Sequence, residues 1–331
     1  MTYLKALLLW SVSSTLLASN LPHLTLYSAR EESLITPILK LYQQQTGQEI
    51  RAVTAKADDL LQRLKAEGKH SQADILITVD AGDLWFASRQ GLLAKTQSAI
   101  LTQNIPEHLR DPDYHWFGLS VRARTLVYNT TRVSADELVS YPQLAAPQWH
   151  KRLCLRTSQK VYNQSLVAML INQYGVKTTE SFVKGWVNNL AQPPLPKDSA
   201  VIKAIESGAC DIGIINSYYL GRHQLNKPDT QLKLFWPTKE KNGVHINISG
   251  AGITRHSPNK AAATRFLEWL TETQAQYLFA RLNMEYPANP KVAASDIVKA
   301  WGSFDADNQN LMNAGRLQKY ATRLMERAGY N

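Results

Sequence analysis

Apolar and polar positions along the first part of the chain change period in a regular way. Residues 23–28 alternate as a half-buried strand does, and residues 31–47 carry apolar side chains at helical spacing up to Gly47. The same reasoning predicts a strand at 49–55, a helix at 57–68 and a buried strand at 73–79. Such alternation is typical of a parallel sheet with helices on both faces.

The second half of the chain repeats this order. The pattern predicts a strand at 152–156, helices at 163–175, 178–190 and 199–208, and a strand at 211–215. We therefore expect two α/β lobes. Two segments, residues 115–129 and 244–255, are long enough in extended form to cross between the lobes.

The first twenty residues have the layout of a secretory signal peptide. Lys5 precedes an apolar stretch that is too short to span a bilayer, and small residues follow near Ala18 and Ser19. No later segment approaches the ~20 consecutive apolar residues of a membrane anchor. We expect cleavage near residue 19, no membrane insertion, and a mature protein that is free in a Gram-negative periplasm.

The chain has two cysteines, Cys154 and Cys210. An even number in an exported chain favours a disulfide between them, worth roughly 4 kcal/mol in the chain-entropy model. Metal-binding or catalytic thiols are the alternative, but neither cysteine has a CxxC or Cys/His neighbour.

Charge and motifs exclude several classes of function. The formal net charge is +10, yet the basic residues are dispersed, so attraction of small anions or an acidic partner fits better than nucleic acid. The eight histidines show no metal-ligand spacing, and no GxSxG, HExxH, P-loop or GxGxxG motif is present. We therefore expect that the protein is not an enzyme.

Two adjacent tyrosines, Tyr218 and Tyr219, stand where the strand at 211–215 ends. Half-buried packing is the ordinary role of tyrosine. A phenol with a pKa of ~10 binds metal only where a strong cation displaces its proton, and Fe³⁺ is such a hard, strongly Lewis-acidic ion. Two tyrosines at a strand-to-helix corner can converge on one point. Asn216 and Ser217 are expected to cap the helix that follows.

Motifs spread over almost the whole mature chain carry a resemblance to a known family. They include "LYSAR", "ADILITVDAGDLW", "VYNQSLVAMLI", "INSYYLGR", "VHINISGAGI", "SPNKAAATRFLEWL", "NMEYP" and "VKAWGSF". The chain resembles the periplasmic ferric-ion-binding proteins of bacterial iron ABC transporters. The resemblance implies a type II periplasmic binding fold, with two α/β lobes joined by a strand hinge. It also implies a monomer that delivers ferric iron to an inner-membrane ABC permease and its ATPase.

The resemblance also implies the ligands of the metal. Tyr162 of "YNQS" and the pair Tyr218 and Tyr219 match the phenolate ligands of Fe³⁺ in the three-tyrosine, carbonate-dependent subgroup. Many relatives have a histidine after the "YS.R" segment, where this chain has Glu31 and Glu32. Glu31 is a candidate oxygen ligand, a partner of a nearby arginine, or a first-turn acid that suits the helix dipole.

Three arginines match the family's candidates for a synergistic carbonate or bicarbonate: Arg30, Arg122 and Arg124. Arg122 and Arg124 are expected to share one face of a strand, and structural salt bridges are the alternative for each arginine. Asp80 is a further candidate pocket residue, because some relatives use a carboxylate there. Three arginines beside a trivalent cation would repel it, so we expect an exogenous anion to complete the metal's coordination.

The predicted lobes are discontinuous in sequence. Residues 1–19 form the signal peptide, 20–121 with 246–290 the N-terminal lobe, and 122–245 with 291–331 the C-terminal lobe. The alternative function is an exported binding protein for a small anion or organic solute, in which the tyrosines stack or donate hydrogen bonds without a metal.

Overall fold

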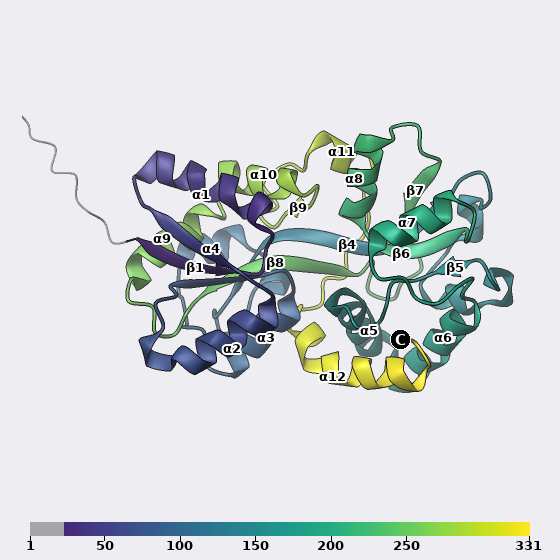
Figure 1. The fold of residues 1–331 in the computed structure, drawn as a ribbon, viewed down its shortest axis with the longest axis horizontal. Coiled ribbons are helices and arrows are strands. Elements are labelled where there is room, and N and C mark those ends of the chain that lie inside the picture. Colours follow the sequence, from purple (N-terminus) through teal and green to yellow (C-terminus); the bar gives the residue numbers. More distant parts are fainter. Residues whose placement is uncertain (1–22) are drawn as a thin grey trace, which may run out of the picture.

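A computed structural model describes residues 23–331 of the protein, so the predicted signal peptide at residues 1–19 lies outside the described residues. Within the described range, no helix combines the length and the apolar character needed to cross a membrane. Figure 1 shows an elongated molecule with two α/β halves side by side.

The helices and strands follow the predicted order closely. The strands are β1 (Leu24–Ser28), β2 (Ile50–Thr54), β3 (Ile75–Thr78), β4 (Phe117–Asn129), β5 (Leu153–Cys154), β6 (Ile212–Asn216), β7 (Leu232–Phe235), β8 (Ile246–Ile253) and β9 (Tyr286–Pro287). The helices are α1 (Glu32–Thr46), α2 (Ala57–Glu67), α3 (Ala81–Arg89), α4 (Ala99–Asn104), α5 (Val161–Tyr174), α6 (Val176–Asn188), α7 (Asp198–Glu206), α8 (Ser217–Asn226), α9 (Lys260–Trp269), α10 (Thr273–Leu282), α11 (Asp296–Lys299) and α12 (Met312–Arg327).

One sheet runs through both halves in the order β2-β1-β3-β8-β4-β6-β5. Strands β2, β1 and β3 are parallel, as are β5 and β6, which confirms the predicted alternation of strands and helices. Strands β4 and β8 cross between the halves and pair antiparallel with each other (Figure 1). Strand β4 pairs with β8 along its first part and with β6 along its second, so it joins the two halves.

The sequence accounts for the buried face of helix α1 and for its C-terminal end. The buried side chains Ile35, Ile38, Leu39 and Tyr42 recur at the spacing of one helical face. Helix α1 ends at Gly47, which has a φ of 72° and donates its backbone N–H to the carbonyl of Gln43. A left-handed residue at this position favours glycine, which has no Cβ.

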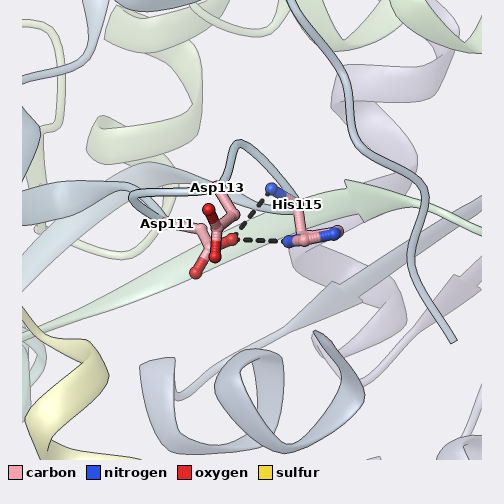
Figure 2. A group of neighbouring side chains, drawn as sticks. All are labelled: Asp111, Asp113 and His115. Atoms are coloured by element: carbon pink, nitrogen blue, oxygen red, sulfur yellow. Dashed lines mark hydrogen bonds and ion pairs between the residues drawn. The ribbon is translucent and has the colours of Figure 1, made fainter. Parts of the chain in front are cut away.

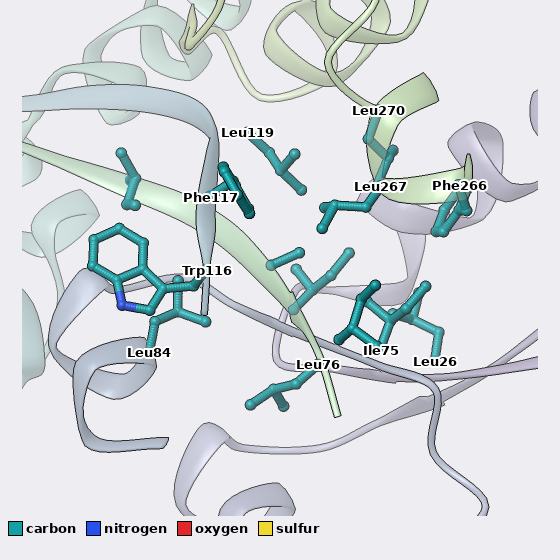
Figure 3. Close-up of a cluster of buried hydrophobic side chains, with 14 of the residues drawn as sticks. Leu26, Ile75, Leu76, Leu84, Trp116, Phe117, Leu119, Phe266, Leu267 and Leu270 are labelled. Atoms are coloured by element: carbon teal, nitrogen blue, oxygen red, sulfur yellow. The ribbon is translucent and has the colours of Figure 1, made fainter. Parts of the chain in front are cut away.

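The N-terminal half has one hydrophobic core between its sheet and helices. Leu26 of β1, Ile75 of β3, Phe117 of β4 and Phe266 of α9 are fully buried in it (Figure 3). This cluster defines what we call the N-terminal lobe. Leu311 also belongs to this core, although the sequence assigned residues 291–331 to the other lobe.

The C-terminal half has two hydrophobic clusters, one on each face of β6. Ile212 and Ile214 of β6 belong to the larger cluster with Trp149 and Trp186, whereas Ile215 belongs to the smaller one. These two clusters define the C-terminal lobe. Helix α12 packs against α5 of this lobe and also against α3 of the N-terminal lobe. The exact lobe boundaries stay a prediction.

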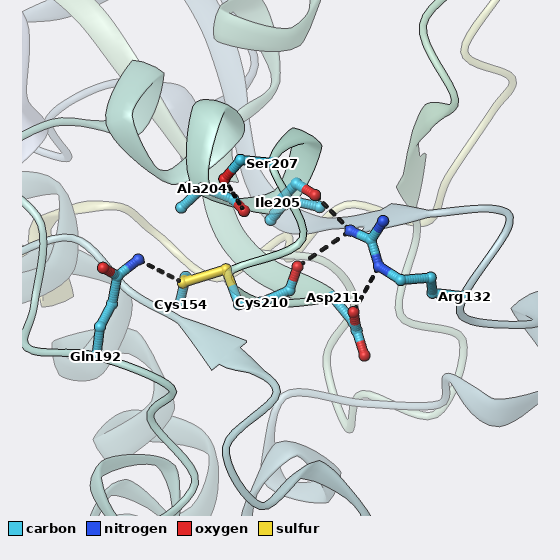
Figure 4. Close-up of a disulfide and its surroundings, with 8 residues drawn as sticks. All are labelled: Arg132, Cys154, Gln192, Ala204, Ile205, Ser207, Cys210 and Asp211. Atoms are coloured by element: carbon cyan, nitrogen blue, oxygen red, sulfur yellow. Dashed lines mark hydrogen bonds and ion pairs between the residues drawn. A yellow bond between two sulfur atoms is a disulfide. The ribbon is translucent and has the colours of Figure 1, made fainter.

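The predicted disulfide between Cys154 and Cys210 is confirmed, and both cysteines are buried (Figure 4). Cys154 ends β5 and Cys210 lies two residues before β6. Arg132 donates hydrogen bonds to the carbonyl of Cys210 and to the carboxylate of Asp211 beside it. The disulfide therefore links β5, which precedes Tyr162, to the residues just before β6, which precedes Tyr218.

We expect that purified protein contains no free thiol, which mass spectrometry after alkylation under denaturing conditions measures directly. Replacing both cysteines by alanine should lower the free energy of unfolding by about 2–5 kcal/mol, because the unfolded chain regains the entropy of a long loop. Urea unfolding of the two proteins checks this difference. Alkylation of both cysteines in denatured protein that has not been reduced would contradict the disulfide.

Candidate functional site

A cavity of about 110 Å³ lies where the two lobes meet. The N-terminal lobe contributes residues from the ends of β1 and β3 and from the turn after α10, and the C-terminal lobe contributes the beginnings of α5 and α8. The lining residues are Ala29, Arg30, Glu31, Leu34, Val79, Arg122, Tyr162, Tyr218, Tyr219, Arg222, Ser249, Asn283 and Glu285. Arginine and tyrosine side chains therefore dominate its wall.

The structure brings the three predicted tyrosines together. Tyr162 is the second residue of α5, while Tyr218 and Tyr219 are the second and third residues of α8. The rings of Tyr218 and Tyr219 stack with centroids 4.6 Å apart. Two helices thus begin at one cavity, and each presents phenols from its first turn.

The prediction that Asn216 and Ser217 cap α8 is wrong for the side chain of Asn216, which makes no capping hydrogen bond. Its Oδ1 accepts instead from Arg124, and its Nδ2 donates to the Tyr218 hydroxyl at 3.4 Å. Ser217 is the first residue of the helix rather than its cap.

Burial favours the protonated form of Tyr162 and Tyr218. It raises the pKa of Tyr218 well above its usual value, and nearby Tyr162 adds to the effect. Burial also raises the pKa of Tyr162, while the positive charges of Arg122 and Arg156 act in the opposite direction. These two guanidinium groups lie 5.1 and 5.3 Å from the Tyr162 ring centroid. A strong cation is needed to displace these protons near neutral pH.

Arg30 lines the cavity but is already held by the protein. Its Nη1 and Nη2 each lie 3.2 Å from Oε2 of Glu285, and Nη1 also donates to Ser249. The guanidinium stacks on the Phe279 ring at 4.2 Å. Of the three guanidinium nitrogens of Arg30, Nε alone has no hydrogen-bond partner among the described residues.

Arg122 and Asp80 lie beside each other at the lobe junction. Nη2 of Arg122 donates to the Val79 carbonyl and lies 3.9 Å from Oδ2 of Asp80. Within residues 23–331, Nη1 of Arg122 has no hydrogen-bond partner. Asp80 does not line the cavity: its carboxylate accepts from Ser165 of the other lobe and from Asn247, each at 2.8 Å.

Arg124 does not reach the cavity. Its guanidinium is buried, with Nη1 3.1 Å from Oδ2 of Asp198 and Nε 2.9 Å from Oδ1 of Asn163. The structural salt bridge, which the sequence left as the alternative, is therefore what the structure shows for Arg124.

Glu31 and Glu32 are both exposed at the beginning of α1, and only Glu31 lines the cavity. Sequence reasoning missed four polar cavity residues: Arg222, Ser249, Asn283 and Glu285. Glu285 is buried and also accepts from Ser120. Residues 281–289 mix polar and apolar side chains, so the local pattern gives no signal that Glu285 is buried beside a cation.

One group of potential metal ligands lies away from this cavity. Asp111, Asp113 and His115 place their ligand atoms within 4.8 Å of one another (Figure 2). Oδ2 of Asp111 accepts from the backbone N–H of His115 and lies 2.7 Å from its Nδ1. These contacts stabilise the turn before β4, and they account for the cluster without a metal.

Two α/β lobes joined by crossing strands, with a polar cavity between them, define a two-lobed ligand-binding protein. The chain belongs to the family of bacterial extracellular solute-binding proteins, which its residues 38–306 match. This membership confirms the expectation of a binding protein rather than an enzyme.

Individual relatives narrow the class further. The chain is 38% identical to iron uptake protein A1 of Synechocystis, over 93% of this chain and 87% of that protein. It matches the Trichodesmium IdiA/FutA structure in complex with iron and citrate at a TM-score of 0.89 and 39% identity, over 93% and 100% of the two chains. Apo ferric ion-binding protein A of Pasteurella haemolytica matches at a TM-score of 0.86 and 36% identity, over 93% and 98%. The predicted type II fold and family resemblance are confirmed.

The Arg30–Glu285 pair generates a prediction about stability. Glu285→Gln should lower the free energy of unfolding by about 3–5 kcal/mol, because it leaves a buried guanidinium without its counter-charge. The double variant Arg30→Met/Glu285→Met should be less destabilised, since neither charge is then buried alone. Urea unfolding of the metal-free proteins gives both values. A double variant that is destabilised as strongly as Glu285→Gln would contradict this account of the buried pair.

Proposed function

We propose that the protein captures ferric iron in this cavity through the phenolates of Tyr162, Tyr218 and Tyr219, and carries it to a transporter. The convergence of three phenols from two helix beginnings on one small cavity is the observation that supports this most strongly. Three phenolates balance the charge of one Fe³⁺ ion, which favours hard anionic oxygen ligands.

The remaining coordination positions need further oxygen donors. We propose that carbonate or bicarbonate supplies them, held by Nη1 of Arg122 and Nε of Arg30. Both atoms are buried, both arginines line the cavity, and neither atom has a hydrogen-bond partner among the described residues. A planar oxyanion can accept such N–H groups with two oxygens.

The three arginines are not uncompensated charges. The sequence treated Arg30, Arg122 and Arg124 as uncompensated positive charges, but each lies within 4 Å of a buried carboxylate. Support for the anion therefore comes from the two unpartnered N–H groups and from the unfilled coordination positions. Glu31, at the edge of the cavity, is the competing oxygen donor.

The same proposal places the protein in the periplasm, as a monomer that hands ferric iron to an inner-membrane ABC permease and its ATPase. Its support is the predicted signal peptide together with relatives named as an iron uptake protein and as ferric-binding proteins.

Addition of ferric iron to the apo protein should produce the visible charge-transfer band of a ferric phenolate. Tyr219→Phe should lower the affinity by more than the 10–100-fold that an outer-shell substitution typically costs. Glu31→Gln should change it by less than about tenfold, or 1.4 kcal/mol. Affinity should fall as pH is lowered, because protons compete for the phenolates whose pKa burial raises.

Chelator competition followed at the band measures these affinities. A wild-type protein that stays colourless with ferric iron, yet binds a small anion or organic solute, would support the metal-free alternative. If Glu31→Gln abolishes the band, Glu31 is a metal ligand.

Removal of bicarbonate from the buffer should weaken ferric binding. Arg122→Lys should bind ferric iron equally weakly with or without bicarbonate, because lysine keeps the charge beside Asp80 but lacks the second nitrogen of the guanidinium fork. Arg124→Lys, on the same strand but outside the cavity, is the matched control and should keep the bicarbonate dependence. Wild-type binding that is indifferent to bicarbonate would contradict the anion.

A further inference from the structure

The turn after α10 lines the cavity from the N-terminal lobe and faces α8 of the C-terminal lobe. Asn283 and Glu285 both line the cavity, and Met284 lies between them with a φ of 53°. This left-handed conformation is uncommon for a residue with a side chain, and it persists only where surrounding contacts fix it. Asn283 donates to Oε1 of Glu285 at 2.7 Å, so the turn is tied to the carboxylate that holds Arg30.

This turn contacts α8, the helix that begins with Tyr218 and Tyr219. Nη2 of Arg222 donates to Oδ1 of Asn283 across the junction. Met284 is buried in a small cluster with Tyr218 and with Val298 of α11. The N-terminal lobe thus touches the phenol-bearing helix through one polar and one apolar contact.

Gly221 makes the apolar contact possible. A Cβ built on Gly221 would lie 2.6 Å from Sδ of Met284 and 2.8 Å from a ring atom of Trp301. Gly221 lies inside α8 and does not have a positive φ, so the backbone conformation alone does not call for glycine. Since glycine weakens a helix interior, the close approach of Met284 and Trp301 explains its presence.

We propose that Met284, seated on Gly221, is a positioning contact that holds the lobes closed over the bound ferric ion and slows its release. This inference rests on the proposed function. All three phenols belong to the C-terminal lobe, so the metal can bind there without the turn. Contacts that exist only in the closed state then favour that state, and their loss raises the population of the open one.

Release of ferric iron to a chelator, followed at the phenolate band, tests the contact together with small-angle scattering. Met284→Ala should keep the band but release iron faster, on the order of tenfold, a typical size for coupling between sites. Its iron-loaded form should have a larger radius of gyration than the wild type's. Gly221→Ala should act in the same direction, because its Cβ displaces Met284.

The double variant Gly221→Ala/Met284→Ala should release iron more slowly than the product of the two single effects, since both changes break one contact. Two controls separate closure from general destabilisation. Leu225→Ala changes an exposed side chain on α8, and Met169→Ala removes a buried methionine from α5. Both should release iron at the wild-type rate, although Met169→Ala should lower the melting temperature.

Different outcomes overturn different conclusions. A wild type that forms no ferric band overturns the proposed function and this inference together. The positioning contact alone is overturned if the wild type forms the band and compacts, while Met284→Ala and Gly221→Ala leave the release rate and the radius of gyration unchanged. Thermal unfolding of the apo variants checks their folding, and Gly221→Ala decides the question if Met284→Ala does not fold.

Discussion

A buried charge needs a counter-charge, and the arrangement of the site follows from that constraint. Three ion pairs surround the lobe junction: Arg30–Glu285, Arg122–Asp80 and Arg124–Asp198. Each of these guanidinium groups lies within 4 Å of a buried carboxylate, so none of the three charges is buried alone. A trivalent cation that exchanges three phenol protons for itself leaves the charge of the site unchanged. Three phenolates therefore balance the charge of the proposed ferric ion. The proposed anion adds negative charge, which would lie against Arg30 and Arg122.

The ion pairs also connect the site to the architecture. Strand β4 carries both Arg122 and Arg124 where it crosses between the lobes. Asp80, which faces Arg122, accepts a hydrogen bond from Ser165 of the other lobe. The crossing strand thus carries two arginines that pair with carboxylates at the junction of the lobes. A change in the angle between the lobes must alter the surroundings of Arg122, which lies over the Tyr162 ring.

Sequence reasoning located what depends on local pattern and missed what depends on distant partners. The strands and helices named in advance follow from periodicity, and the three tyrosines follow from motifs shared with a known family, so these features were predictable. The partner of Arg30 is 255 residues away, and that of Arg124 is 74 residues away. Without these partners both arginines seemed free to hold an anion. The capping role predicted for Asn216 failed for the same reason, because a buried arginine takes its side-chain oxygen.

The placement of all three phenols on one lobe has a consequence for unloading. A ligand set divided between two lobes comes apart when the cleft opens, but this set stays intact, since α5 and α8 both belong to the C-terminal lobe. In the proposed binding mode, separation of the lobes exposes the ion without breaking any iron–phenolate bond. Unloading therefore requires a chemical act at the ion itself: a proton returned to a phenolate, a competing chelator, or an electron that lowers the ion's charge. The transporter that receives the iron must provide that chemical step in addition to separating the lobes.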